Sequence, residues 1–137
     1  MSLRTAGAMT GMRIYDEVDA LNASAAFVPG SLTVVSVPPG ADASNTNPTG
    51  GANGTGVIDI RNVNVPADGQ VQVQFELTVD PTEPIGTVVL NQSALRQSDG
   101  SPFGLSDDPT INGQSDPTVT GDEDPTRLVI VPTLLVF

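Results

Sequence analysis

Four residue types are absent from this chain of 137 residues: cysteine, histidine, tryptophan and lysine. Without Cys there is no disulfide framework, no thiolate nucleophile and no cysteine zinc site. Without His there is no Ser-His-Asp triad, and without Lys there is no Schiff base and no P-loop. An enzyme would have to work with carboxylates alone, and the single Tyr offers little of the aromatic sugar platform that usually accompanies glycosidase carboxylates. We therefore expect a protein that is not an enzyme.

Positive charge is also scarce. The chain has five basic residues, all of them Arg, and 16 Asp and Glu, which gives a net charge of −11. Such a charge disfavours nucleic acids and anionic membranes as partners. No apolar run approaches the roughly 20 residues of a membrane-spanning helix, so we expect no direct membrane insertion. The oxygen ligands that remain, carboxylates and amides, suit a hard cation such as calcium.

The clearest structural signal lies in residues 69–80, where apolar and polar residues alternate strictly. This period of two predicts a strand with one face in a core and the other in water. The predicted core face is Val71, Val73, Phe75, Leu77 and Val79, and the predicted outer face is Gln72, Gln74 and Glu76.

Other short apolar runs, bounded by Gly, Pro, Asn or Asp, are typical of strands. They cover residues 12–15, 31–37, 56–65, 86–97 and 127–131. Strands at this spacing predict an all-β protein, an antiparallel β-sandwich of about seven strands. The nearest candidate for a helix is residues 17–26, which could make one or two turns with Asp16 as N-cap.

The sequence also indicates what fills the core and what stays outside it. Phe27, Phe75 and Phe103 are the predicted bulky core residues. The polar residues 42–56 contain no packing residue, so we expect a mobile loop at one end of the sandwich.

The segment from residue 99 to residue 124 contains seven carboxylates and no basic residue. Asp-Pro-Thr occurs in it at 108–110, 116–118 and 124–126, and a fourth copy stands at 80–82. We favour a series of turns or edge segments that block edge-to-edge pairing, because Pro fixes φ and removes a donor, and the Asp before it can bond to the backbone beyond. The alternative is calcium, because even spacing can place carboxylates on one side of an extended chain. The candidate calcium ligands are Asp107, Asp108, Asp116, Asp122 and Asp124.

Two amides, Asn91 and Gln92, lie in the middle of an otherwise apolar predicted strand. A buried amide without a partner costs about 1–3 kcal/mol. We therefore expect these side chains to bridge a loop or a neighbouring strand edge rather than to contact a ligand.

A series of short motifs follows in order along the chain: TGMRIYD at 10–16, VPGSLTV at 28–34, NGT at 53–55, VNVPADG at 63–69, GTVVLNQSA at 86–94, SDDPT at 106–110 and SDPT at 115–118. In their order and spacing, over roughly residues 10–131, the chain resembles the bacterial conserved-repeat surface domain catalogued as domain of unknown function eleven. The resemblance implies an immunoglobulin-like β-sandwich, repeated in tandem in large secreted or cell-surface proteins that include adhesins. It implies no catalytic residues.

Domains of this family open with a strand before the Thr-Gly motif, but residues 1–9 do not have the pattern of a strand. We interpret residues 1–9 as an expression remnant and disordered lead-in. Residues 10–131 are then a single β-sandwich domain, and residues 132–137 begin a linker or strand toward a following repeat.

Three functions follow as hypotheses. The favoured one is a structural spacer module of a large bacterial cell-surface or secreted protein, with neighbouring repeats as partners and an extracellular location. The alternative is a calcium-dependent binding module that uses the Asp-rich segment. A third is a lectin-like domain that binds a carbohydrate, or a protein of the host or cell surface, through the polar loop at 42–56.

Overall fold

The computed structural model describes residues 2–4, 7–113 and 121–132, and this part of the chain contains ten strands and no helix. The strands are β1 (Ser2–Arg4), β2 (Met9–Glu17), β3 (Thr33–Ser36), β4 (Val57–Val65), β5 (Gln70–Gln72), β6 (Gln74–Glu76), β7 (Val88–Asn91), β8 (Ala94–Arg96), β9 (Pro102–Leu105) and β10 (Thr126–Val129).

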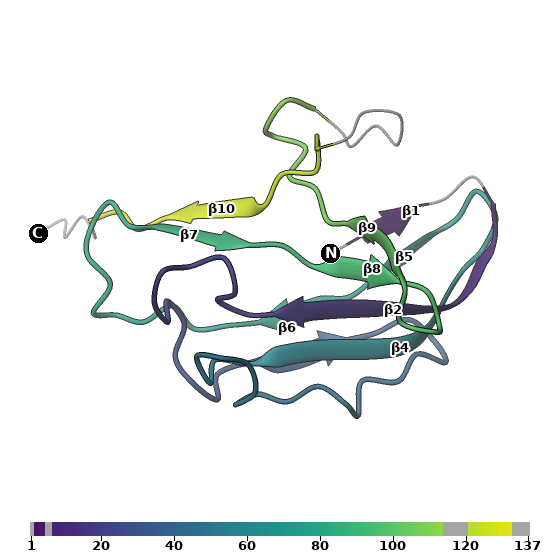
Figure 1. Ribbon diagram of the computed structural model, residues 1–137, viewed down its shortest axis with the longest axis horizontal. Coiled ribbons are helices and arrows are strands. Elements are labelled where there is room, and N and C mark those ends of the chain that lie inside the picture. Colours follow the sequence, from purple (N-terminus) through teal and green to yellow (C-terminus); the bar gives the residue numbers. More distant parts are fainter. Residues whose placement is uncertain (1, 5–6, 114–120, 133–137) are drawn as a thin grey trace, which may run out of the picture.

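The strands form two layers, with β2 and β4 in front of β6 in Figure 1. The first layer is the four-stranded sheet β4-β2-β8-β9, and the pair β7-β10 continues it along the segment that leads into β8. The second layer consists of the pairs β3-β6 and β1-β5. All pairs are antiparallel. The prediction of an all-β antiparallel sandwich is confirmed.

The sandwich has more strands than the seven or so that the sequence predicts, because two long predicted strands are divided and because β1 and β9 lie outside the predicted ranges. Residues 69–80 divide at Val73, where the partner changes from β1 to β3. Residues 86–97 divide after Asn91, where the partner changes from β10 to β2. The prediction that residues 1–9 contain no strand is wrong at Ser2–Arg4, which pair with β5. Three residues are too few to show a period in the sequence.

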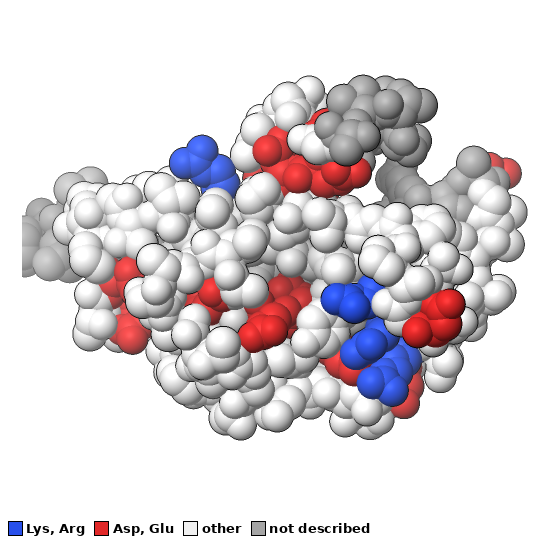
Figure 2. Space-filling model, in the orientation of Figure 1, with Lys and Arg blue, Asp and Glu red and all other residues white. Residues whose placement is uncertain are grey.

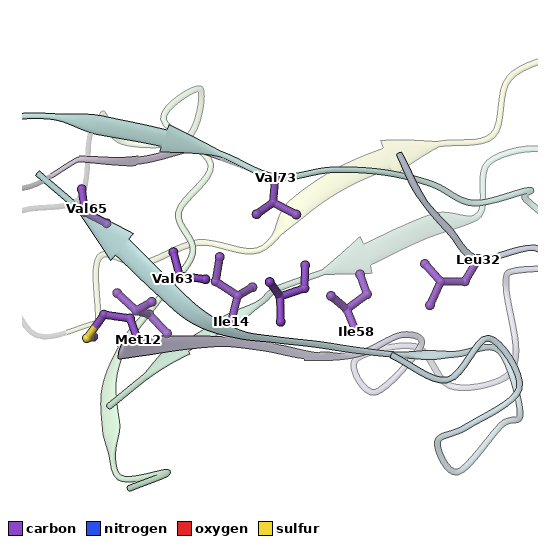
Figure 3. Packing of buried hydrophobic residues seen from close by; sticks show 9 residues of the cluster. Met12, Ile14, Leu32, Ile58, Val63, Val65 and Val73 are labelled. Carbon is purple, nitrogen blue, oxygen red and sulfur yellow. The ribbon is translucent and has the colours of Figure 1, made fainter. Parts of the chain in front are cut away.

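The alternation predicted for residues 69–80 is confirmed. Every residue of the predicted core face packs against the apolar core, and Gln72, Gln74 and Glu76 are exposed. Val73 is the only fully buried one of the five, and Figure 3 shows its side chain reaching toward the facing sheet, where Ile14 and Ile58 lie. Phe75 is half-buried, so the sandwich is filled mainly by aliphatic residues.

The apolar core is divided into two clusters. The larger cluster is Met12, Ile14, Leu32, Ile58, Ile60, Val63, Val65, Val73 and Leu95. The smaller cluster is Val18, Ala26, Phe27 and Val89. Leu77 of the second layer packs against both. The two clusters are therefore parts of one sandwich interior. On the first layer, polar side chains separate them.

Three polar residues occupy that position, and we call Asp16, Asn91 and Ser93 the polar belt. Asp16 follows Ile14 on the inward face of β2 and precedes the buried Val18, which comes directly after the strand, so Asp16 stands between the two clusters. Asp16 is 2% exposed, and its Oδ2 accepts hydrogen bonds from Asn91 Nδ2 at 2.6 Å and Ser93 Oγ at 2.7 Å. Its Oδ1 is buried and has no hydrogen-bond partner.

Residues 18–24 form turns and bends, and the prediction of a short helix over residues 17–26 capped by Asp16 is wrong. Asp16 belongs to β2, and the residue that organises the turns is Asp19, which is 1% exposed and has a φ of 67°. The Asp19 carboxylate accepts hydrogen bonds from the backbone N–H of Ala26 at 3.0 Å and of Phe27 at 3.3 Å. A helix of one or two turns is marginal by itself, whereas this carboxylate satisfies two buried backbone donors.

Residues 42–56 cover the edge of β4 that faces away from β2. Backbone bridges join Asp42 to Arg61 and Asn47 to Val57, each through two hydrogen bonds of 2.8 Å. Thr55 is fully buried and donates its hydroxyl hydrogen to the backbone oxygen of Val18 at 3.1 Å. The prediction of a loop at one end of the sandwich without packing residues is therefore wrong, because Thr55 is buried and the polar groups pair with an otherwise open strand edge.

The three predicted core phenylalanines differ in burial. Phe27 is 8% exposed and belongs to the smaller cluster, and Phe75 is half-buried. Phe103 is 56% exposed, so its assignment to the core is wrong. It lies on β9, the edge strand of its sheet, which neither buried cluster reaches in the described part of the chain.

Candidate functional site

Three of the five arginines gather on the outer face of the four-stranded sheet. Arg13 on β2 lies directly opposite Arg96 on β8 in the strand register. Arg61 on β4 shares the carboxylate of Asp59 with Arg13. Figure 2 shows blue side chains in one group over these strands, apart from a blue side chain over β10. We call Arg13, Arg61 and Arg96 the arginine row.

Asp59 is held between two guanidinium groups. Arg13 Nε and Arg61 Nη2 lie 2.7 and 2.8 Å from its two carboxylate oxygens, and its side chain is only 6% exposed. Burial alone would raise the pKa of Asp59, but the hydrogen bonds and positive charges of Arg61 and Arg13 outweigh it and hold the pKa below its usual range. One negative charge thus faces two positive ones, and the pKa of Arg61 is raised first by Asp59 and further by the nearby carboxylate of Asp42.

Arg96 completes the row through an aromatic ring rather than a carboxylate. The guanidinium carbons of Arg13 and Arg96 lie 5.0 and 4.9 Å from the centroid of the Tyr15 ring, within the range of cation–π contacts. Among the described residues Arg96 has no salt bridge, and its Nε is buried without a hydrogen-bond partner. A buried donor on a charged group that lacks an acceptor is costly, and this Nε is too deeply buried to be satisfied by a partner in solvent.

The sequence analysis missed this row, although part of the signal was present. Arg13 and Tyr15 alternate with the buried Met12 and Ile14, so the period of two already places them on the outer face. Only the pairing of β2 with β8 brings Arg96 to the same place, more than 80 positions further along the chain.

Two of the Asp-Pro-Thr units, at 80–82 and 108–110, form turns in which the Thr donates hydrogen bonds to the Asp side chain. Thr82 donates its backbone N–H and its hydroxyl to Asp80 Oδ1 at 2.8 and 2.6 Å, and Thr110 does the same to Asp108 Oδ1 at 3.0 and 2.6 Å. These bonds, those of the Thr side chains first, lower the pKa of both carboxyl groups. The interpretation as turns is confirmed for these two copies.

The described residues 106–113 and 121–125 lie together in a projecting lobe near β9 and β10 (Figure 1). We call Asp107, Asp108, Asp122, Glu123 and Asp124 the acidic lobe. Its two parts are joined by bonds from the backbone N–H of Asp108 to Asp124 O at 2.9 Å and from the backbone N–H of Asp124 to Asp107 Oδ1 at 3.1 Å.

The lobe contains four of the five predicted calcium ligands, and the fifth, Asp116, lies outside the described residues. Asp124 Oδ2 accepts a hydrogen bond from Asn112 Nδ2 at 2.7 Å. In the part of the chain that the structure describes, no three carboxylates are grouped as a metal site requires. Calcium binding by this segment stays a prediction.

The amides of Asn91 and Gln92 bridge other parts of the protein, as predicted. Gln92 Nε2 donates to the backbone oxygens of Ser106 and Glu123, both at 3.0 Å, and so ties the acidic lobe to the end of β7. Asn91 donates to Asp16 in the polar belt. Both amides therefore serve the fold.

The buried carboxyl group of Asp16 makes stability depend on pH. Burial raises the pKa of Asp16 above its usual range, although the hydrogen bonds from Ser93 and Asn91 partly oppose this. The folded state therefore binds a proton more tightly than the unfolded state, and the contribution of Asp16 is lost as the pH rises through the raised pKa. We expect Asp16→Asn to raise the free energy of unfolding at pH 7 by about 1–3 kcal/mol, because the buried charge is removed and one acceptor is kept.

Chemical denaturation of the wild-type protein and Asp16→Asn between pH 3 and pH 8 measures this effect, and the gain should shrink toward acid. Asp59→Asn is the matched control, because the pKa of Asp59 is shifted in the opposite direction. This variant should lose stability at pH 7, and the loss of stability should shrink as the pH falls. A destabilised Asp16→Asn at pH 7 would contradict the assignment of Asp16 as an unfavourable buried charge.

Comparison with known proteins finds no family model, no curated protein and no solved structure that matches this chain. No helix suited to crossing a membrane occurs in the residues described.

Proposed function

We propose that this chain is a non-catalytic spacer module of a large bacterial cell-surface or secreted protein. The observation that carries the proposal is how its polar side chains are engaged. Asp19, Asp80 and Asp108 fix turns, and Asp16 joins two segments of one sheet through the polar belt. Residues used in this way maintain a fold.

The resemblance to the conserved-repeat surface domain supports the same proposal. In that family the β-sandwich is repeated in tandem, so neighbouring copies would be the immediate partners of this module. The gene of the parent protein provides the direct test: we expect further copies of this module and a segment that attaches the protein to the cell surface. A parent protein with a single copy, joined to a catalytic domain in the cytoplasm, would contradict the proposal.

A calcium-dependent binding module is the second candidate, favoured by the arrangement of the acidic lobe. The fold joins the segments that carry Asp107, Asp108 and Asp124 through hydrogen bonds of their backbone N–H groups, with no basic residue between positions 99 and 124. If the lobe holds calcium, the ion stabilises the folded state by mass action, by about 2.7 kcal/mol at a concentration 100 times the dissociation constant.

Thermal unfolding in millimolar calcium and in EDTA, at matched ionic strength, separates the two candidates. A calcium module predicts a higher melting temperature in calcium, and Asp124→Asn should remove the difference. Magnesium at the same concentration controls for unspecific screening. Identical melting curves in calcium and EDTA would reject the second candidate and leave the spacer proposal intact.

A further inference from the structure

In the described part of the chain, β7 has a neighbouring strand on only one side, where it pairs with β10 and Val88 lies opposite Val129. On the other side no strand follows it. β2 lies beside β8 but ends at Glu17, and the turns of residues 18–24 come next to β7 instead (Figure 1). This part of the first layer therefore has an open strand edge.

The backbone groups of Leu90 and Val88 point to that open side. The Leu90 N–H donates to Asn22 Oδ1 at 2.9 Å, and Asn22 Nδ2 donates to Leu90 O at 3.1 Å, so the amide of Asn22 takes the place of a strand at this residue. Val88 stands two positions earlier and points the same way. The bond from the Ile130 N–H to Thr87 O at 2.9 Å agrees with this, because it directs the residue before Val88 toward β10. No hydrogen bond among the described residues satisfies the N–H or the C=O of Val88.

A hollow of about 160 Å³ adjoins this edge. Leu21, Val88 and Leu90 contribute its apolar lining, and the side chains of Leu21 and Val88 are 48% and 39% exposed. An apolar cavity of about 150 Å³ is large enough to hold benzene. The hollow therefore suits a single aromatic or branched aliphatic side chain of a partner.

The hollow also contains one carboxylate, that of Glu83. Neither ion pair between described residues includes Glu83, and the chain around it has a net charge of −11. An acidic ligand would be repelled here, whereas a Lys or Arg side chain can pair with Glu83. Charge therefore favours a basic partner.

We propose that the open edge of β7 and the hollow beside it bind an extended peptide that carries one apolar side chain and a basic residue. The peptide adds as a strand: its backbone bonds to the N–H and C=O of Val88, its apolar side chain fills the hollow, and its basic residue pairs with Glu83. Side chains two positions apart lie on the same face of a strand, so the basic residue stands two positions from the apolar one. This inference goes beyond the spacer function and does not depend on it.

The blocked peptide acetyl-Arg-Thr-Phe-Thr-Arg-amide has this pattern and serves as the probe. We expect a dissociation constant of about 1 mM, because a short flexible peptide loses freedom on binding and an exposed ion pair is worth little. An NMR titration of the full chain measures the affinity and locates the site, since the backbone amide signal of Val88 and the side-chain amide signals of Asn22 should shift. The same peptide with Ala in place of Phe should bind about tenfold more weakly, because the hollow stays unfilled.

Val88→Pro tests the open edge. It removes the N–H that the peptide needs, at the first residue of β7, where a strand tolerates Pro. We expect binding about tenfold weaker, followed by the signals of Asn22. Val129→Pro is the matched control, because it makes the same change at the opposite residue of the edge strand β10, and it should alter the affinity less than about threefold. Circular dichroism and thermal unfolding verify that both variants are folded.

Glu83→Gln tests the charge. The wild-type chain should bind the Arg peptide about fivefold more tightly than the same peptide with Glu in place of Arg. Glu83→Gln should lose most of this preference. Glu76→Gln removes an exposed carboxylate on β6, away from the hollow, and should retain it.

A Val88 signal that does not shift at millimolar concentrations of the probe would overturn the proposal, as would a Val88→Pro variant that binds as tightly as Val129→Pro. If the Val88 signal instead shifts with protein concentration in the absence of peptide, a second copy covers the edge and the assignment to a basic peptide is wrong. None of these results bears on the spacer function, which is tested on the parent protein.

Discussion

Replacing Asp19 with Ala is expected to lower the free energy of unfolding by about 3–5 kcal/mol. The Asp19 carboxylate accepts hydrogen bonds from two buried backbone N–H groups and from Asn22 Nδ2 at 2.8 Å. Without it, the N–H groups of Ala26 and Phe27 lose their acceptor, and each orphaned donor costs about 1–3 kcal/mol. The φ of 67° adds to the loss, because Asp tolerates this conformation better than Ala does.

Urea denaturation of the wild-type protein and the variant measures the loss. Asp19→Asn is the matched control, since Asn also tolerates a positive φ and keeps one oxygen acceptor, and we expect it to lose clearly less than Asp19→Ala. A loss below 1 kcal/mol for Asp19→Ala would mean that water replaces the carboxylate and that this turn does not depend on it.

Replacing Ile60 with Ala is expected to cost about 2–5 kcal/mol, since the side chain is fully buried in the larger apolar cluster. Ile60 lies at the centre of β4, which pairs with β2 along most of its length. Its neighbours come from both layers, so the surrounding structure can close the resulting cavity only in part.

Phe103→Ala is the informative comparison for this variant. It removes a larger apolar side chain, but one that is 56% exposed at the edge strand β9. We expect a loss of less than about 1 kcal/mol. If Phe103→Ala were as harmful as Ile60→Ala in the same denaturation experiment, Phe103 would have to be buried in solution, by another part of the chain or by a second copy.

The polar belt and Asp19 place charged side chains in the interior of a small sandwich. Asp16 lies between the two apolar clusters, where an aliphatic residue of similar size would add stability. Its bonds to Asn91 and Ser93 join β2 to the segment between β7 and β8. This segment changes its pairing partner at the same place, from β10 to β2. We infer that the belt determines where the change occurs, because a shift of one residue would turn Asn91 outward and leave Asp16 without its donors.

The sequence predicted the fold class because strand periodicity is a local property. The alternation of residues 69–80, with aliphatic residues on one face and Gln and Glu on the other, appears in the structure as expected. The turns at Asp80 and Asp108 were equally predictable, because each depends on three consecutive residues. The bridging role of Asn91 and Gln92 followed from the cost of burying an unpaired amide.

Errors arose wherever the outcome depended on distant residues. Phe103 is a large apolar residue of the kind that fills cores, but it is exposed because β9 lies at the edge of the sheet. Residues 42–56 have the composition of a free loop, but they pair with the edge of β4. Asp16 precedes a segment that could form a helix, as an N-cap residue would, but its side chain is buried in the sandwich because β2 continues through it.

What the sequence by itself determined is thus most of the strands, the inward face of residues 69–80 and the turns at Asp80 and Asp108, since each depends on a few neighbouring residues. Only the tertiary structure decided the pairing order and register of these strands. That order places Arg96 beside Arg13 and Tyr15, joins Arg61 to Arg13 through Asp59, and brings Asp107 to Asp124. Local periodicity reports which side of a strand a residue occupies, but it contains no information on which strand lies next to it.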